Sequence, residues 1–300
     1  MNGLTANMRG ALFMMGSMLS FTFNDAFMKS LAGEVPLFQA IFVRGVATSV
    51  FLLVIAWRLG AFKTSISRKD WTIILWRALA EVLAAYFFIS ALFNMNFANV
   101  SAILQALPLC ITLAGAIFLR EPVGWRRMGA ILIGFFGVLL IVQPGGDDFN
   151  SYSVYAILSV IAVTFRDLAA RRLSGSVPSM IVALSAAFMV TASAGLAAVT
   201  QPWVTLSQTH VLHLGGTVFF VIGGYLFSVM AMRVGDISFV APFRYVSLVG
   251  AIALGAVVFG ERPGWLTLIG AAIVVATGLF TLFRERGVNQ RASHVGLRVR

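Results

Sequence analysis

Apolar segments long enough to cross a membrane follow one another along almost the whole chain. A helix needs about 20 predominantly apolar residues to span the hydrocarbon core of a bilayer. Segments of this kind cover residues 9–31, 37–57, 71–93, 98–119, 126–142, 153–171, 180–199, 213–234, 239–259 and 265–283. Because backbone inside hydrocarbon must satisfy its own hydrogen bonds, we predict an all-α integral membrane protein with ten transmembrane helices.

Composition excludes the main alternatives to this class. Of the 300 residues, 59% are hydrophobic and 11% are charged, a charged share less than half that of a typical soluble protein. The alternating ten-residue segments of a membrane β-barrel do not occur. The net charge of +11 does not indicate a nucleic-acid partner, because Lys and Arg follow the loops instead of forming a basic domain. The single cysteine, Cys110, and three His without ligand spacing predict neither a metal nor a cofactor.

The chain contains two related halves. Residues 22–36 and 164–178 match without a gap at a fixed offset of 142. The positions identical to their counterparts are Thr22, Phe23, Asp25, Leu31, Gly33, Val35 and Pro36. A second match, at an offset of 140, relates Val100, Gly115, Ala116, Glu121, Gly124 and Trp125 to residues of the other half. Self-similarity at a fixed period indicates an internal duplication.

The boundary between the halves falls at the turn-forming segment Gln143–Asp148. We therefore predict a first five-helix repeat over residues 1–145, a second over 146–287, and a basic tail over 288–300. Since five is odd, the second copy enters the membrane from the opposite side. The two copies then form a 5+5 inverted repeat.

Basic residues are distributed unequally between the two sides of this predicted topology. Sixteen Lys and Arg fall on the side that holds both termini, whereas only Lys29 and Arg262 fall on the other. The positive-inside rule therefore predicts cytoplasmic N- and C-termini for a multi-pass protein of a bacterial-type inner membrane.

Seven charged residues remain inside the predicted spans. Each costs about 2.5–3.5 kcal/mol at mid-membrane unless it is paired or hydrated. They are Asp25, Arg44, Arg77, Glu81, Arg166, Asp167 and Arg244. We predict an outer gating salt bridge between Asp25 and Arg44. An inner gating cluster would contain Arg166, Asp167 and an Arg77–Glu81 pair at helical i,i+4 spacing. The alternative is that these pairs fix helix register, or that Arg77 and Arg166 extend to the membrane surface.

Polar residues inside the predicted membrane spans predict the location of the substrate site. The candidates for substrate binding or for lining a cavity are Asn24, Glu81, Tyr86, Gln105, Arg244 and Tyr245. Gln105 precedes Pro108 and Arg244 follows Pro242. Proline removes a hydrogen bond from a helix interior, so we expect both spans to bend beside the transport pathway.

These features together resemble a known family. The ten spans, the Leu-Arg-Glu121-Pro and Gly-Glu261-Arg-Pro turns and the loops at Pro36 and Pro178 are similar to EamA-type members of the drug/metabolite transporter superfamily. The resemblance covers about residues 9–283. It implies a secondary carrier with a basket-like bundle around a central cavity, lined mainly by the first, third, fourth, sixth, eighth and ninth spans.

In overall style the chain is most similar to bacterial exporters of amino acids and metabolites. We expect a monomer that exports amino acids by alternating access, with Arg244 near a substrate carboxylate and an acidic residue near its amine. The sequence does not decide whether transport is coupled to protons through Asp25 or Glu81. Within the same class, the alternatives are uptake of a nucleoside-like metabolite such as S-adenosylmethionine and efflux of cationic drugs.

A membrane-embedded enzyme is the alternative from a different class. The chain contains no HExxH zinc motif, no GxSxG elbow and no phosphate-binding Gly-rich loop, so enzymatic activity is not expected. A channel would need a charged or carbonyl-lined ring repeated around an axis, which a single duplication does not supply.

Overall fold

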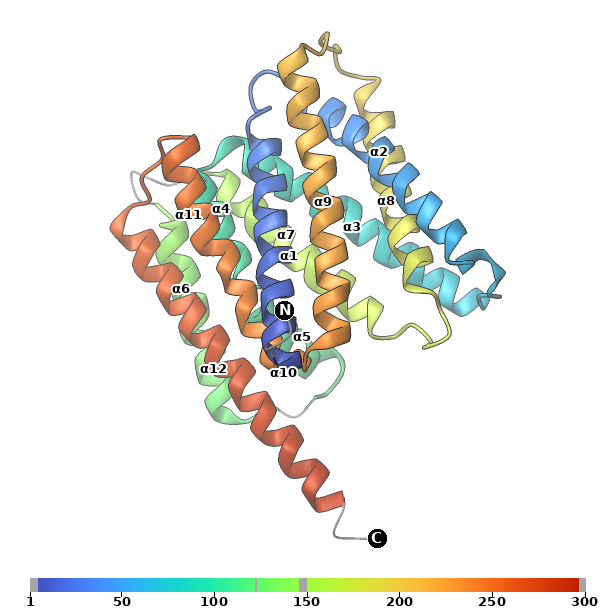
Figure 1. Ribbon diagram of the computed structural model, residues 1–300. Coiled ribbons are helices and arrows are strands. Elements are labelled where there is room, and N and C mark those ends of the chain that lie inside the picture. Colours follow the sequence, from blue (N-terminus) through green and yellow to red (C-terminus); the bar gives the residue numbers. More distant parts are fainter. Residues whose placement is uncertain (1–4, 122, 146–149, 297–300) are drawn as a thin grey trace. The chain divides into compact units, whose positions relative to one another are not determined.

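The computed structural model describes residues 5–121, 123–145 and 150–296, and every regular element in these ranges is helical (Figure 1). Part of the predicted boundary turn, residues 146–148, lies outside them. The elements are α1 (Ala6–Lys29), α2 (Leu37–Arg58), η1 (Ala61–Lys63), α3 (Arg68–Asn94), α4 (Phe97–Leu104), α5 (Leu107–Phe118), α6 (Trp125–Val142), α7 (Tyr152–Ala170), α8 (Ser179–Ala198), α9 (Gln208–Val234), α10 (Ile237–Val240), η2 (Ala241–Tyr245), α11 (Val246–Val258) and α12 (Trp265–Gly296).

The structure confirms the helical membrane class. Among the described residues, nine helical segments are long and apolar enough to cross a membrane, and they correspond to the second to tenth predicted spans. The first predicted span forms α1, which has 24 residues but is not among the nine. Large apolar side chains such as Trp57, Leu196 and Val257 are 70%, 76% and 84% exposed. Such exposed apolar surface is stable only against lipid or a partner.

Two spans are interrupted next to proline, as the sequence predicts. Helix α4 ends at Leu104 and α5 begins at Leu107, with Pro108 in its first turn. Between them, Gln105 N–H donates to the Ala102 carbonyl at 3.2 Å, a tighter i to i−3 bond. Pro242 lies likewise in the first turn of η2, between α10 and α11. A proline has no N–H to give to the preceding turn, so the α-helical pattern stops there.

The contacts divide the chain into two compact units. The first unit contains the described parts of residues 1–22, 101–149 and 223–300, and the second contains residues 23–100 and 150–222. Each unit therefore draws helices from both predicted sequence halves.

In the second unit, α2 packs antiparallel against α8 (Figure 1). Ser49 Oγ and Thr191 Oγ1 lie 3.2 Å apart near the middle of the pair. Toward one end, the Gln39 side chain exchanges hydrogen bonds of 2.8 and 3.0 Å with the Val204 backbone. Toward the other end, Ala56 packs in a buried cluster with Ile181. Residue numbers rise along α2 as they fall along α8.

In the first unit, α6 packs against α12 through small residues. A Cβ built on Gly270 would lie 2.5 Å from the carbonyl oxygen of Gly137, and one on Gly137 would lie 2.9 Å from the carbonyl oxygen of Gly270. Helices pack in membranes through such small residues because they let two backbones approach closely. The fifth predicted span therefore packs against the tenth through these glycines.

We expect Gly270→Ala to destabilise the folded protein by about 1–3 kcal/mol, because the new methyl group has no space against the α6 backbone. The measurement is the thermal unfolding of purified protein in detergent. Gly129→Ala is the matched control, because a Cβ on this α6 residue meets nothing within 4 Å. Equal melting temperatures for the two variants would contradict the close α6–α12 contact.

Candidate functional site

Four charged side chains of α3 and α7 form one group in the second unit, which we call the ionic cluster. Its members are Arg77, Glu81, Arg166 and Asp167. Arg166 donates from Nη1 to Glu81 Oε1 at 3.0 Å and from Nε to Asp167 Oδ1 at 2.9 Å. Arg77 Nη2 lies 3.7 Å from Glu81 Oε2, the i,i+4 pair that the sequence predicts. Two cations and two carboxylates leave the cluster without formal net charge.

These side chains meet because α3 and α7 run antiparallel across each other. At one end of the contact, Ser174 Oγ donates to the Asp70 carboxylate at 3.0 Å. At the other end, Asn150 Nδ2 donates to the Asn94 carbonyl at 2.7 Å. Within this register Arg166 lies opposite Glu81. The side chains of the four cluster residues are only 17–31% exposed, so water screens their interactions partially.

A second group on the same helices is aromatic, and we call it the aromatic cluster. Its members are Phe38, Tyr86, Phe87, Tyr152 and Tyr155. Phe38 of α2 stacks on Tyr86, with ring centroids 5.8 Å apart and planes 10° from parallel. Tyr155 lies 6.1 Å from Tyr86 and packs edge-on to Phe87 at 5.4 Å. Tyr152 completes the group, 5.2 Å from Tyr155.

One face of α7 carries residues of both clusters. Tyr152, Tyr155, Ser159 and Arg166 are spaced by three, four and seven residues, the spacing that recurs on one side of a helix. The Ser159 hydroxyl donates to the Ala84 carbonyl of α3 at 3.3 Å. Eleven residues separate Tyr155 from Arg166, which corresponds to about 16 Å along the helix axis.

The predicted outer residues also belong to the second unit. Asn24 Nδ2 donates to Asp25 Oδ1 at 2.8 Å within α1. Asn24 is 4% exposed, and its Oδ1 has no hydrogen-bond partner among the described residues. Arg44 of α2 interacts electrostatically with the Asp25 carboxylate. The role of Asp25 and Arg44 as a gate stays a prediction.

The remaining predicted site residues belong to the first unit. Gln105 Nε2 donates to Ser247 Oγ at 2.9 Å, and Ser247 Oγ donates in turn to the Arg244 carbonyl at 2.9 Å. Arg244 is exposed. Tyr245 is 7% exposed, and its hydroxyl lies against Gly278 of α12 without a hydrogen-bond partner in the described part of the chain. The structure therefore brings together Gln105 and the segment after Arg244.

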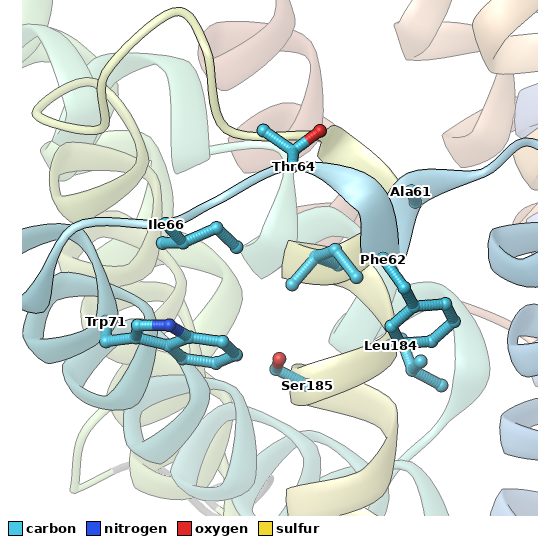
Figure 2. A pocket seen from close by; sticks show the side chains of 8 residues that line it. Ala61, Phe62, Thr64, Ile66, Trp71, Leu184 and Ser185 are labelled. Atoms are coloured by element: carbon cyan, nitrogen blue, oxygen red, sulfur yellow. The ribbon is translucent and has the colours of Figure 1, made fainter.

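An apolar hollow lies elsewhere in the second unit, where the segment after α2 meets α3 and α8 (Figure 2). It has a volume of about 170 Å³, and its lining includes Phe62, Ile66, Trp71 and Leu184. Figure 2 shows the Trp71 ring and the Ser185 hydroxyl at this hollow. No residue of the ionic cluster lines it. In the described residues, no group of three or more His, Cys, Asp or Glu could hold a metal ion.

Reasoning from the sequence identified all four members of the ionic cluster but only Tyr86 of the aromatic cluster. The signal for Tyr152 and Tyr155 is their spacing to Arg166 on α7. Tyrosine is also scarce, at 5 residues against 26 Phe. Phe38 carries no such signal, because its place beside Tyr86 follows from how α2 packs.

The comparisons with known proteins identify relatives along the whole chain. A family model described as the EamA-like transporter family matches residues 8–143 and 150–283. An S-adenosylmethionine uptake transporter of Rickettsia conorii is 27% identical over 285 residues, which cover 92% of each chain. A riboflavin transporter of Vibrio cholerae is 30% identical over 197 residues, 65% of each chain. The pseudopaline exporter CntI of Pseudomonas aeruginosa is 25% identical over 267 residues, 85% of this chain and 90% of that one.

A solved crystal structure has the same fold. It matches with a TM-score of 0.65 at 19% identity, covering 93% of this chain and 99% of the other. At this identity the match concerns the fold alone.

We expect Glu81→Gln and Arg166→Gln each to lower the free energy of unfolding by about 1–3 kcal/mol, because each removes the nearest inter-helix partner of a largely buried charge. The double variant should lose less than the sum of the two. Denaturant unfolding of the purified protein in detergent, run as a double-mutant cycle, measures this coupling. Strict additivity would show that Glu81 and Arg166 do not interact.

Proposed function

We propose that this chain carries a small zwitterionic metabolite across the membrane by alternating access. The chain belongs to the EamA-like transporter family within the drug/metabolite transporter superfamily. The observation that carries the proposal is the ionic cluster of α3 and α7, in which Arg166 joins two carboxylates at 3.0 and 2.9 Å. An enzymatic role is not proposed, because the named relatives are transporters.

A zwitterion can enter such a cluster without leaving any charge unpaired. Its carboxylate accepts hydrogen bonds from Arg166, as Glu81 does without substrate, and its ammonium group binds the Glu81 carboxylate that is released. Charged hydrogen bonds of this kind are among the stronger polar contacts in proteins. The cluster then has two paired arrangements, with and without substrate. A carrier needs such an element, because a substrate shifts a conformational equilibrium only through differential contacts with the two states.

Amino acids are the simplest zwitterions that fit, and their export is our first candidate. Uptake of S-adenosylmethionine, which also carries an amino-acid group, is the second. It is supported by the similarity to the Rickettsia conorii transporter, which extends over 92% of each chain. The ionic cluster itself does not set the direction of transport, because a carrier follows the gradient of its substrate or coupling ion.

The inverted repeat is part of the proposal, and a contact inside the second unit supports it. A two-fold axis in the membrane plane packs counterpart helices antiparallel and brings residues near the axis against their own counterparts. The hydrogen-bonded pair Ser49–Thr191 is separated by 142 residues, the offset of the first sequence match. It lies in the antiparallel α2–α8 contact. The two ranges matched by the family model, 8–143 and 150–283, agree with this division.

The topology completes the proposal. With sixteen basic residues on the side of the termini and two on the other, we place both termini in the cytoplasm and the protein in an inner membrane. We propose further that the outer gate contains Asp25 and Arg44 and that the ionic cluster contributes to the inner gate.

Purified protein in liposomes should transport labelled amino acids, and Arg166→Gln should reduce the rate at least about tenfold, because it removes the charged donor for the carboxylate. Arg172→Gln is the matched control, since Arg172 is an exposed residue just after α7. If Arg166→Gln transports as fast as Arg172→Gln, the ionic cluster is not the substrate site. Normal transport by Arg244→Ala would likewise contradict the predicted role of Arg244.

Proton coupling through Asp25 predicts that an imposed pH gradient accelerates transport and that Asp25→Asn removes this acceleration. The asparagine keeps the size of the side chain and cannot ionise, so any uncoupled transport should persist. The measurement is the initial rate in liposomes with and without the gradient. A rate that does not depend on the gradient in the unmodified protein would exclude coupling to protons.

A further inference from the structure

The rings of the aromatic cluster are not ordinary core residues. All five are half-buried, so each keeps an uncovered part of its surface. Phe97, by contrast, is 1% exposed and contributes to the core. The five rings come from α2, α3 and α7, and they contact one another at centroid distances of 5.2–6.1 Å. The five rings therefore form one contact group in which every ring is only partly covered.

The residue types in this cluster are unusual for the chain. Tyr86, Tyr152 and Tyr155 are three of only 5 tyrosines, whereas the chain has 26 phenylalanines. Contact with lipid or with other apolar side chains is satisfied by Phe, the commonest aromatic residue of the chain. Tyrosine adds a hydroxyl at the edge of the ring, which suits a ligand with both an aromatic face and polar groups.

The distance between the aromatic cluster and the ionic cluster limits which ligands could contact both. Tyr155 and Arg166 lie eleven positions apart on α7, about 16 Å along the axis. The distance between the two side chains is shorter if they point toward each other along the helix. An amino acid held at Arg166 is nevertheless too short to reach Tyr155. A ligand that touches both clusters has an amino-acid group at one end and a ring at the other.

We infer that the aromatic cluster is the subsite for a planar nitrogen heterocycle, and that the substrate joins such a nucleoside-like ring to an amino-acid group held by the ionic cluster. The inference rests on the proposed function for the ionic end of the substrate. Tyr155 and Tyr86 stack on the ring, which is a contact available to any base because every base has a π-face. Arg166 and Glu81 hold the zwitterionic end.

Binding to the purified protein in detergent tests this inference with three ligands: S-adenosylmethionine, methionine and adenosine. The unmodified protein should bind S-adenosylmethionine more tightly than either fragment. Tyr155→Leu should weaken S-adenosylmethionine binding about tenfold, because it removes one stacking partner, and should leave methionine binding unchanged. Tyr155→Phe keeps the ring and loses only the hydroxyl, so it should lose less affinity than Tyr155→Leu. Tyr225→Leu is the matched control, because Tyr225 packs on Phe21 in the first unit.

Tyr86→Leu provides a second variant if Tyr155→Leu does not fold, as judged by gel filtration and melting temperature. Equal losses for methionine and S-adenosylmethionine in both Leu variants would overturn the ring subsite. Binding of methionine but of neither ring compound by the unmodified protein would also overturn it, and would leave the proposed zwitterion carrier intact. Adenosine binding that is lost in Tyr155→Leu and kept in Arg166→Gln, without methionine binding, would uphold the ring subsite and refute the zwitterion proposal.

Discussion

The cost of placing ionised groups in hydrocarbon is the constraint on which this structure depends. A charge at mid-membrane is tolerated when an opposite charge and hydrogen bonds are supplied at short range. Arg166 meets this condition with Glu81 on a neighbouring helix and Asp167 on its own. The ion pairs therefore require α3 and α7 to lie in one register. The same requirement keeps a charged centre available between these two helices.

Much of the architecture could be predicted from sequence because a small number of strict rules governs membrane helices. Segment length and apolar content predicted the helices, and Pro108 and Pro242 marked the places where the α-helical pattern of two spans is interrupted. The first span was harder to judge. Helix α1 forms, but Asn24, Asp25 and Lys29 lower its apolar share, so length and composition do not select it.

The candidate site could be predicted less completely, for a physical reason. Burial cost marks charged residues one at a time, so Glu81 and Arg166 stand out in sequence. That cost says nothing of which helix supplies the partner, and the pairing of α3 with α7 is a property of tertiary packing. Aromatic residues carry no comparable penalty in a membrane, where Phe38 and Tyr155 are unremarkable until their rings are seen together.

The hydrogen bond between Ser49 and Thr191 has an evolutionary consequence. Under the proposed inverted repeat these residues are counterparts that meet at the pseudo-symmetry axis. In an antiparallel dimer of two identical half-chains, such a position would pair each residue with itself. Fusion into a single chain lifts this restriction, so a serine can face a threonine. Once the halves are joined, counterpart positions can carry different residues, so the two sides of the membrane can have different side chains.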